Sequence, residues 1–89
     1  MARSTARPSV TIYTTPTCPD CHALKAWLRQ HRIAFDERDL TDPAVAVEAR
    51  ERTGVRVAPI TIIGNRVVYG TFTHQKPLIE AHLFTEGAD

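Results

Sequence analysis

The two cysteines of the chain form the motif Cys18-Pro19-Asp20-Cys21, which lies between a predicted strand and a predicted helix. Residues 9–14 alternate apolar and polar side chains, a pattern typical of a strand. Residues 19–32 show helical spacing, and Pro19 suits a first helical position because no backbone N–H bond is needed there. The fold must therefore present a cysteine pair at the N-terminus of a helix, directly after a strand.

The rest of the chain predicts three more strands and two more helices. A weaker, charged strand is expected over residues 34–40. Asp42 and Pro43 favour the start of a helix that Gly54 ends, with Glu48 and Arg52 paired on its surface. Two β-branched runs, residues 60–63 and 66–69, flank Gly64-Asn65, which is typical of a hairpin. A last helix is expected over residues 76–84. The side chains of the first and last helices that are expected to face the core of the protein are Leu24, Trp27, Leu28, His31, Leu78, Ile79, His82 and Leu83.

The element order β-α-β-α-β-β-α predicts an α/β fold with one mixed four-stranded sheet flanked by three helices. The first two strands are joined by a helix and should be parallel, whereas the last two form an antiparallel hairpin. Residues 9–86 are expected to be a single domain, preceded by a flexible arm at residues 1–8 and followed by a short tail.

The composition narrows the classes of function. The chain has 89 residues, of which 43% are hydrophobic, and a formal net charge of +1. This near-balance gives no electrostatic footprint for nucleic acid or an anionic membrane, and no apolar run approaches the ~20 residues of a membrane span. Two cysteines do not make a disulfide-stapled mini-protein. We expect a cytoplasmic monomer that binds neither nucleic acid nor membrane.

The cysteine pair predicts thiol chemistry with a division of roles. Helical spacing puts Cys21 on the face of Leu24 and Leu28, so it should be buried, whereas Cys18 precedes the helix and should be exposed. Unpaired N–H groups at the helix N-terminus favour the Cys18 thiolate, although the nearby carboxylate of Asp20 works against it. An exposed attacking thiol backed by a covered resolving thiol is the arrangement that two-step disulfide exchange requires.

Two other interpretations of the motif, a zinc site and a structural disulfide, are favoured less by the sequence. A closed zinc site needs four ligands, and the four histidines do not form a second pair at ligand spacing, so no metal site is expected. A structural disulfide across so short a loop would constrain the unfolded chain little. His22 follows Cys21 on the solvent stripe of its helix and is expected to be a solvated residue.

The sequence resembles the glutaredoxin family of the thioredoxin fold over nearly its whole length. The resemblance rests on residues 12–21, on Val57-Ala58-Pro59 before the third strand, and on Gly70 after the fourth. It implies that Cys18 is the nucleophile, that Pro59 is cis and faces the cysteines, and that Ala58 offers its backbone to the substrate. It further implies a set of substrate-binding positions: Thr15, Pro19, Asp20, Ala58, Pro59, Gly70, Thr71 and Phe72.

The chain departs from the family at positions that bind glutathione. Glutaredoxins usually carry lysine where this chain has Thr15, tyrosine where it has Asp20, and glycine with acidic residues where it has residues 69–73. The cations that could replace the missing lysine are Arg38, Arg56 and Lys76.

The resemblance implies a dithiol oxidoreductase without a tightly bound cofactor. It would act on disulfide-containing proteins or mixed disulfides and take electrons from glutathione or another small thiol. One alternative is a redoxin of the NrdH type, which takes electrons from thioredoxin reductase and serves ribonucleotide reductase. Another, from a different class, is a module that binds a metal or an iron–sulfur cluster through Cys18.

Overall fold

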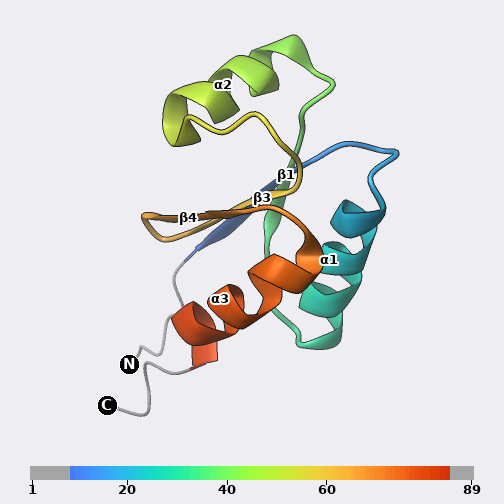
Figure 1. Cartoon of the computed structure of the whole chain (residues 1–89), viewed down its shortest axis with the longest axis vertical. Helices are drawn as coiled ribbons and strands as arrows, with labels where there is room; N and C mark the ends of the chain where they lie inside the picture. Colours follow the sequence, from blue (N-terminus) through green and yellow to red (C-terminus); the bar gives the residue numbers. More distant parts are fainter. Residues whose placement is uncertain (1–8, 85–89) are drawn as a thin grey trace.

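A computed structural model describes residues 9–84 and confirms the expected order β-α-β-α-β-β-α (Figure 1). The expected N-terminal arm, the last two residues of the expected domain and the tail lie outside the described residues. In the part that is described, no helix is long and apolar enough to cross a membrane. The elements are β1 (Val10–Thr14), α1 (Pro19–Gln30), β2 (Asp36–Asp39), α2 (Pro43–Thr53), β3 (Ile60–Ile63), β4 (Arg66–Tyr69) and α3 (Phe72–Phe84).

The four strands form one mixed sheet in the order β2-β1-β3-β4. Strand β1 runs parallel to β2 and antiparallel to β3, and β3 pairs with β4 as the predicted hairpin. Gly64 has a φ of 60° in the turn of that hairpin, in the left-handed region that favours glycine. The fold class predicted from the sequence is confirmed.

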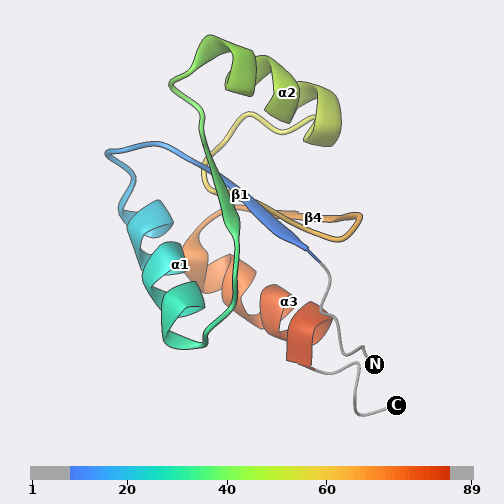
Figure 2. The same cartoon turned by 180° about the vertical axis from the view of Figure 1, so that it is seen from behind.

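The helices cover both faces of the sheet: α1 and α3 lie on one face and α2 on the other (Figures 1 and 2). Alternation along β1 sends Ile12 toward α1 and α3 and Tyr13 toward α2, so each face has its own apolar core. Trp27 is buried, as expected of a core residue. The first core comprises Val10, Ile12, Leu24, Trp27, Leu28, Ile33, Ile63, Ile79 and Leu83, and the second Tyr13, Val45, Ala49, Ile60 and Ile62.

Helix α2 begins and ends where the sequence predicts. The carboxylate of Asp42 accepts the N–H of Ala44 at 2.9 Å, and Gly54 closes the helix with a φ of 72°. Gly54 therefore adopts the left-handed conformation that commonly ends a helix. These local signals fix the helix bounds because each of them satisfies a backbone group that the helix itself leaves unpaired.

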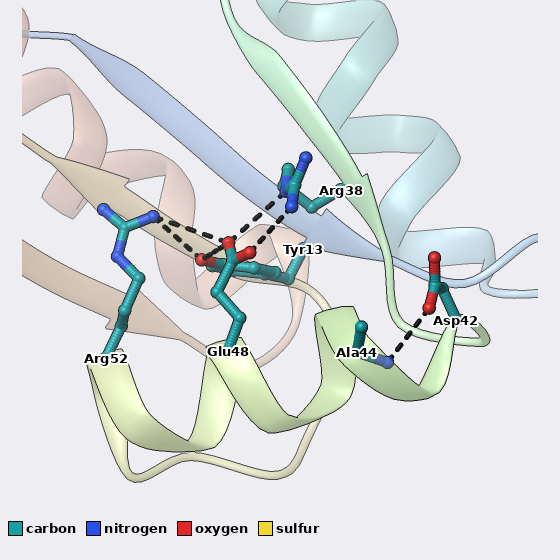
Figure 3. A network of polar contacts seen from close by, with 6 residues as sticks. All are labelled: Tyr13, Arg38, Asp42, Ala44, Glu48 and Arg52. Carbon is teal, nitrogen blue, oxygen red and sulfur yellow. Dashed lines mark hydrogen bonds and ion pairs between the residues drawn. The ribbon is translucent and has the colours of Figure 1, made fainter.

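A polar cluster joins α2 to the sheet (Figure 3). The hydroxyl of Tyr13 on β1 donates to Glu48 Oε2 at 2.7 Å and accepts from Arg52 Nη1 at 2.9 Å. Arg38 on β2 donates from Nη2 to Glu48 Oε1 at 2.7 Å. The ring of Tyr13 is fully buried, and this burial raises the pKa of its hydroxyl. The carboxylate of Glu48 thus joins β1, β2 and α2. The predicted pair of Glu48 and Arg52 is part of this cluster, with Arg52 Nη1 lying 3.7 Å from Glu48 Oε2.

Three helix side chains that were expected to face the core, His31, Leu78 and His82, are not buried there. Helix α1 ends at Gln30, so His31 is its C-cap residue and is exposed, with its ring 4.6 Å from that of Trp27. Helix α3 begins at Phe72, four residues before the expected start. Its buried stripe runs through Gln75, Ile79 and Leu83, which leaves Leu78 40% exposed and His82 only half-buried.

We predict that Tyr13→Phe destabilises the protein by about 1 kcal/mol, because Glu48 and Arg52 lose a hydrogen-bond partner at the sheet surface. In a domain of this size that corresponds to a fall in Tm of roughly 4–8 °C. Thermal unfolding followed by circular dichroism measures it. Tyr69→Phe is the matched control, since Tyr69 is 52% exposed. Equal losses in the two variants would contradict the assigned role of the Tyr13 hydroxyl.

Candidate active site

Cys18 is the N-cap residue of α1, and both thiols are free. The backbone N–H of Cys21 donates to Cys18 Sγ at 3.1 Å, and Pro19 occupies the first helical position. A sulfur that accepts a backbone N–H at the positive end of a helix is in the environment that suits a nucleophilic thiolate. The predicted strand-to-helix junction therefore places Cys18 as the sequence indicates.

The two thiols differ in burial, and the environment of Cys21 shifts its pKa. Cys21 is fully buried, as predicted, whereas Cys18 is half-buried rather than fully exposed, and its sulfur lies over the first turn of its own helix. Burial and a hydrogen bond to Cys18 raise the pKa of the Cys21 thiol to about 12, against smaller opposing effects of a backbone hydrogen bond from Thr15 and of the Lys25 ammonium. At neutral pH the thiol of Cys21 is therefore protonated.

The loop before β3 lies at the same end of the strands as the cysteine motif. Tyr13 pairs with Ile60 in the antiparallel register of β1 and β3, so the segment after Tyr13 and the one before Ile60 leave the sheet together. The Ala58–Pro59 peptide bond is cis, as the resemblance implied, and Pro59 is buried. The topology thus brings Pro59 and the residues leading to Cys18 to one place.

Gln75 holds the neighbouring loops in position, and the sequence analysis missed it. Its side chain is fully buried; Nε2 donates to the carbonyls of Pro59 at 2.8 Å and Gly70 at 2.9 Å. Its Oε1 accepts the hydroxyl of Thr61 at 2.6 Å. The available signal was a polar residue four positions before Ile79, on the buried stripe of the last helix, because such a residue must find partners inside the protein.

Asp20 connects the cysteine motif to the last helix. Its Oδ1 accepts the backbone N–H of Phe72, the first residue of α3, at 3.1 Å. This contact caps α3 from a residue 52 positions earlier in the sequence. The start of α3 therefore lies beside the start of α1. Together with the local cap from Thr71, this contact stabilises a helix start four residues before the one expected.

The other predicted substrate positions fall into two groups. Thr15 and Ala58 line a mainly apolar cavity of about 660 Å³ between α2 and the loop before β3. Gly70, Thr71 and Phe72 form the turn into α3: Gly70 has a φ of 111°, and Thr71 Oγ1 accepts the N–H of His74 at 3.2 Å. The Phe72 ring lies 6.2 Å from that of Trp27, against the core. Their roles toward a substrate stay predictions.

The three cations that could replace the family's lysine lie in different surroundings. Arg38 is held by Glu48, whereas Arg56 lines the cavity beside Ala58 and Lys76 is exposed on α3. His22 is exposed, as expected, and its Nε2 lies 2.9 Å from the carbonyl of Pro16. Over residues 9–84, no three His, Cys, Asp or Glu side chains are grouped so that they could hold a metal ion.

Comparison with known proteins agrees with this arrangement. The glutaredoxin family model matches residues 10–68. The glutaredoxin-like protein NrdH of Lactococcus lactis is 39% identical over 51 residues, 57% of this chain and 71% of that protein. The transcriptional regulator Spx 1 of Oceanobacillus iheyensis is 42% identical over 43 residues, 47% of this chain but only 33% of the regulator.

Two solved structures share the fold. Glutaredoxin from Brucella melitensis superposes with a TM-score of 0.65 and 30% identity, covering 92% of this chain and 87% of its own. The NrdH-redoxin from Escherichia coli, a glutaredoxin-like protein described as having a thioredoxin-like activity profile, gives a TM-score of 0.61 and 30% identity, with 72% and 83% covered. Both solved structures thus share the fold of this chain over most of its length.

We predict that Cys18 reacts with limiting iodoacetamide much faster than Cys21, because only a thiolate attacks and Cys21 has a pKa of about 12. Peptide mapping by mass spectrometry after partial alkylation at pH 7 measures the two rates. Cys18→Ser and Cys21→Ser serve as controls that report each thiol alone. Preferential labelling of Cys21 would overturn the assigned roles.

We predict that Gln75→Met, which keeps the shape of the side chain, destabilises the domain by about 1–3 kcal/mol, the cost of leaving a buried polar group without a partner. Urea unfolding measures the loss. Gln30→Met, at the exposed end of α1, is the matched control and should be neutral. An unchanged stability of Gln75→Met would show that the buried amide does not hold the loops.

Proposed function

The chain belongs to the glutaredoxin family, and from this premise we propose that it is a dithiol thiol–disulfide oxidoreductase. The observation that carries the proposal is the asymmetry of the pair: Cys18 caps α1 and is partly accessible, and Cys21 is buried behind it with a raised pKa. The substrates are disulfides of proteins or mixed disulfides with small thiols. We further propose that it works in the cytoplasm, as a monomer, because a dithiol that reduces other disulfides has to be kept reduced by its surroundings.

In the first step the Cys18 thiolate attacks one sulfur of the substrate disulfide. The substrate S–S bond breaks, a bond forms between Cys18 Sγ and that sulfur, and the other substrate sulfur leaves as a thiolate that takes up a proton. The half-buried Cys18 offers its sulfur from the helix N-terminus, where the backbone N–H of Cys21 holds it in place. The product of this step is a mixed disulfide at Cys18.

In the second step Cys21 attacks Cys18 and releases the reduced product. Burial is the largest effect that raises the pKa of Cys21, and its hydrogen bond to Cys18 and the coulombic effect of that residue raise it further. Burial persists in the mixed disulfide, but the two effects of Cys18 do not. The opposing effects of Thr15 and Lys25 remain. Cys21 therefore gives up its proton more easily when its attack is needed. The pair ends as a Cys18–Cys21 disulfide, which two donor thiols or one donor dithiol reduce again while they become a disulfide themselves.

We propose that the substrate binds at the end of the sheet where three segments meet: the loop after β1, the loop before β3 and the turn into α3. Ala58 offers its backbone beside Pro59, and Thr15 lies on the path from β1 to the motif. The turn formed by Gly70, Thr71 and Phe72 bounds the opposite side, while Pro19 and Asp20 lie between the two sulfurs in sequence. Gln75 fixes the distance between the two loops through its bonds to Pro59 and Gly70.

Glutathione, or another small thiol, is our first candidate for the electron donor. The chain lacks the family's lysine at Thr15 and the acidic residues after Gly70. Each absent charge-assisted bond weakens the binding of glutathione by ~1.5–3 kcal/mol when it is not replaced. Arg56, beside Ala58 at the cavity, is the cation placed to replace the lysine in part. We therefore expect glutathione to support turnover, at a modest rate.

Thioredoxin reductase is the second candidate donor, with ribonucleotide reductase as the protein served. The observation that favours it is the similarity to two proteins named NrdH, one of which is described as having a thioredoxin-like activity profile. The mainly apolar cavity beside Thr15 and Ala58 suits contact with a protein surface better than contact with a charged tripeptide. The two candidates share the chemistry of Cys18 and Cys21 and differ only in the donor.

An NADPH-coupled assay with two arms decides between the donors. One arm supplies glutathione and its reductase, and the other supplies thioredoxin reductase alone. We expect measurable, modest turnover in the glutathione arm. Rapid reduction by thioredoxin reductase without any glutathione turnover would establish the second candidate and overturn the first.

The variant Cys21→Ser separates the two chemical steps in the same assay. We expect it to retain exchange with a small mixed disulfide, which needs only Cys18, and to lose reduction of a protein disulfide, which needs both sulfurs. Cys18→Ser should lose both activities. Full activity of Cys18→Ser in either reaction would contradict the proposed function itself.

A further inference from the structure

The carboxylate of Asp20 is a fixed negative charge at the edge of the site. Asp20 is half-buried in the first turn of α1, and its Oδ1 is held by the N–H of Phe72 at 3.1 Å. A side chain that bonds across two elements does not swing away as a free surface carboxylate does. Its charge therefore stays within two residues of Cys18, whatever lies in the site.

Three of the first four N–H groups of α3 already have partners within the protein. That of Phe72 donates to Asp20, that of His74 to Thr71 Oγ1, and that of Gln75 to the Thr71 carbonyl at 2.9 Å. A helix N-terminus is ordinarily favourable to an anion because of its dipole and its unpaired donors. Here a carboxylate of the chain itself occupies that environment, so an anionic group of a substrate meets a negative charge instead.

The side chains on the other sides of Cys18 that bear on this charge are cations, opposite in sign to Asp20. Lys25, on the same helix, is engaged by Glu37 at 2.9 Å. Across the site, Arg56 lines the cavity beside Ala58. The loop residues Pro59, Gly70 and Thr71 carry no charge. A substrate that lies over Cys18 thus meets a cation toward the loop before β3 and an anion toward α3.

We propose that Asp20 is a specificity-determining residue that sets a charge preference for the disulfide exchanged at Cys18. It disfavours disulfides with an anionic group next to the attacked sulfur and favours those with a cationic group there. The assignment rests on the proposed function, because it concerns the same exchange. It deepens that function by naming the substrate class: neutral or positively charged segments around the disulfide.

The formal net charge of the whole chain predicts the opposite preference. That charge is +1, so a long-range effect alone would draw anionic substrates. A preference for cationic disulfides must therefore come from a local charge. For one unit charge at the distance of a neighbouring side chain, the change in rate is expected to be about three- to tenfold, and it should fade in high salt, where the Debye length is about 3 Å at 1 M.

The test uses three small aliphatic disulfides of different charge: 3,3′-dithiodipropionate, 2-hydroxyethyl disulfide and cystamine. Reduced protein is mixed with each one in excess, the reaction is quenched with acid, and the loss of reduced protein is followed by mass. Comparing the ratio of anionic to cationic rates within each variant removes the intrinsic reactivity of Cys18 and of the leaving groups. Asp20→Asn keeps an oxygen that can accept the N–H of Phe72 and removes the charge.

We expect Asp20→Asn to raise the anionic-to-cationic ratio about tenfold at low salt and to leave it near the wild-type value at 1 M KCl. The ratio of the wild type itself should rise with salt, which requires no variant. Glu51→Gln removes the same charge from an exposed position on α2 and should leave the ratio unchanged.

The outcomes separate this assignment from the proposed function. An unchanged ratio in Asp20→Asn, with or without an equal fall in all three rates, overturns the assignment alone. An equal shift in Glu51→Gln does the same, because it shows an effect of net charge. If the wild type reacts with none of the disulfides, or Cys18→Ser is oxidised as fast as the wild type, the proposed function fails and the assignment with it.

Discussion

The buried side-chain amide of Gln75 is the contact on which the geometry of the site depends. It bonds at the same time to the loop before β3, through Pro59, and to the turn before α3, through Gly70, while Thr61 satisfies its oxygen from within the sheet. A buried amide with every bond made is rigid, because moving any partner leaves a polar group without water or protein to pair with. The distance between the two loops that flank the cysteines is thereby set from the core rather than from the surface.

The two faces of the sheet support this contact in different ways. The face under α1 and α3 packs apolar side chains directly beneath the cysteine motif, and Cys21 is buried at the edge of that core. The face under α2 combines an apolar core with the cluster of Tyr13, Glu48, Arg38 and Arg52. Strand β1 takes part in both, because its alternation sends Ile12 one way and Tyr13 the other. The segment that follows β1 therefore starts from a strand fixed on both faces.

The sequence predicted what local signals determine. The bounds of α2 follow from Asp42 and Gly54, the hairpin from Gly64-Asn65, and the burial of Cys21 from its spacing to Leu24. It failed at the start of α3. Thr71, directly before Phe72, is a local capping residue whose hydroxyl accepts the N–H of His74, whereas the contact from Asp20 to the N–H of Phe72 comes from 52 positions earlier and cannot be read from the sequence around Phe72. The shifted start also determines the buried stripe, which is why Leu78 was misplaced and Gln75 overlooked. The cis bond before Pro59 came from family resemblance, since local sequence indicates only a turn.

In the reaction that we propose, the raised pKa of Cys21 keeps this resolving cysteine from attacking before a mixed disulfide has formed. In the reduced protein Cys21 is protonated, because burial and its bond to Cys18 outweigh the influence of Lys25. That influence is shared, since Lys25 also binds Glu37, whose pKa is lowered by bonds from Thr14 and Lys25. In the mixed disulfide that we propose, Cys18 no longer raises the pKa of Cys21, whereas burial still raises it and Lys25 still lowers it. The proposed order of the two steps follows from this change, because Cys21 loses its proton more easily after Cys18 has reacted than before.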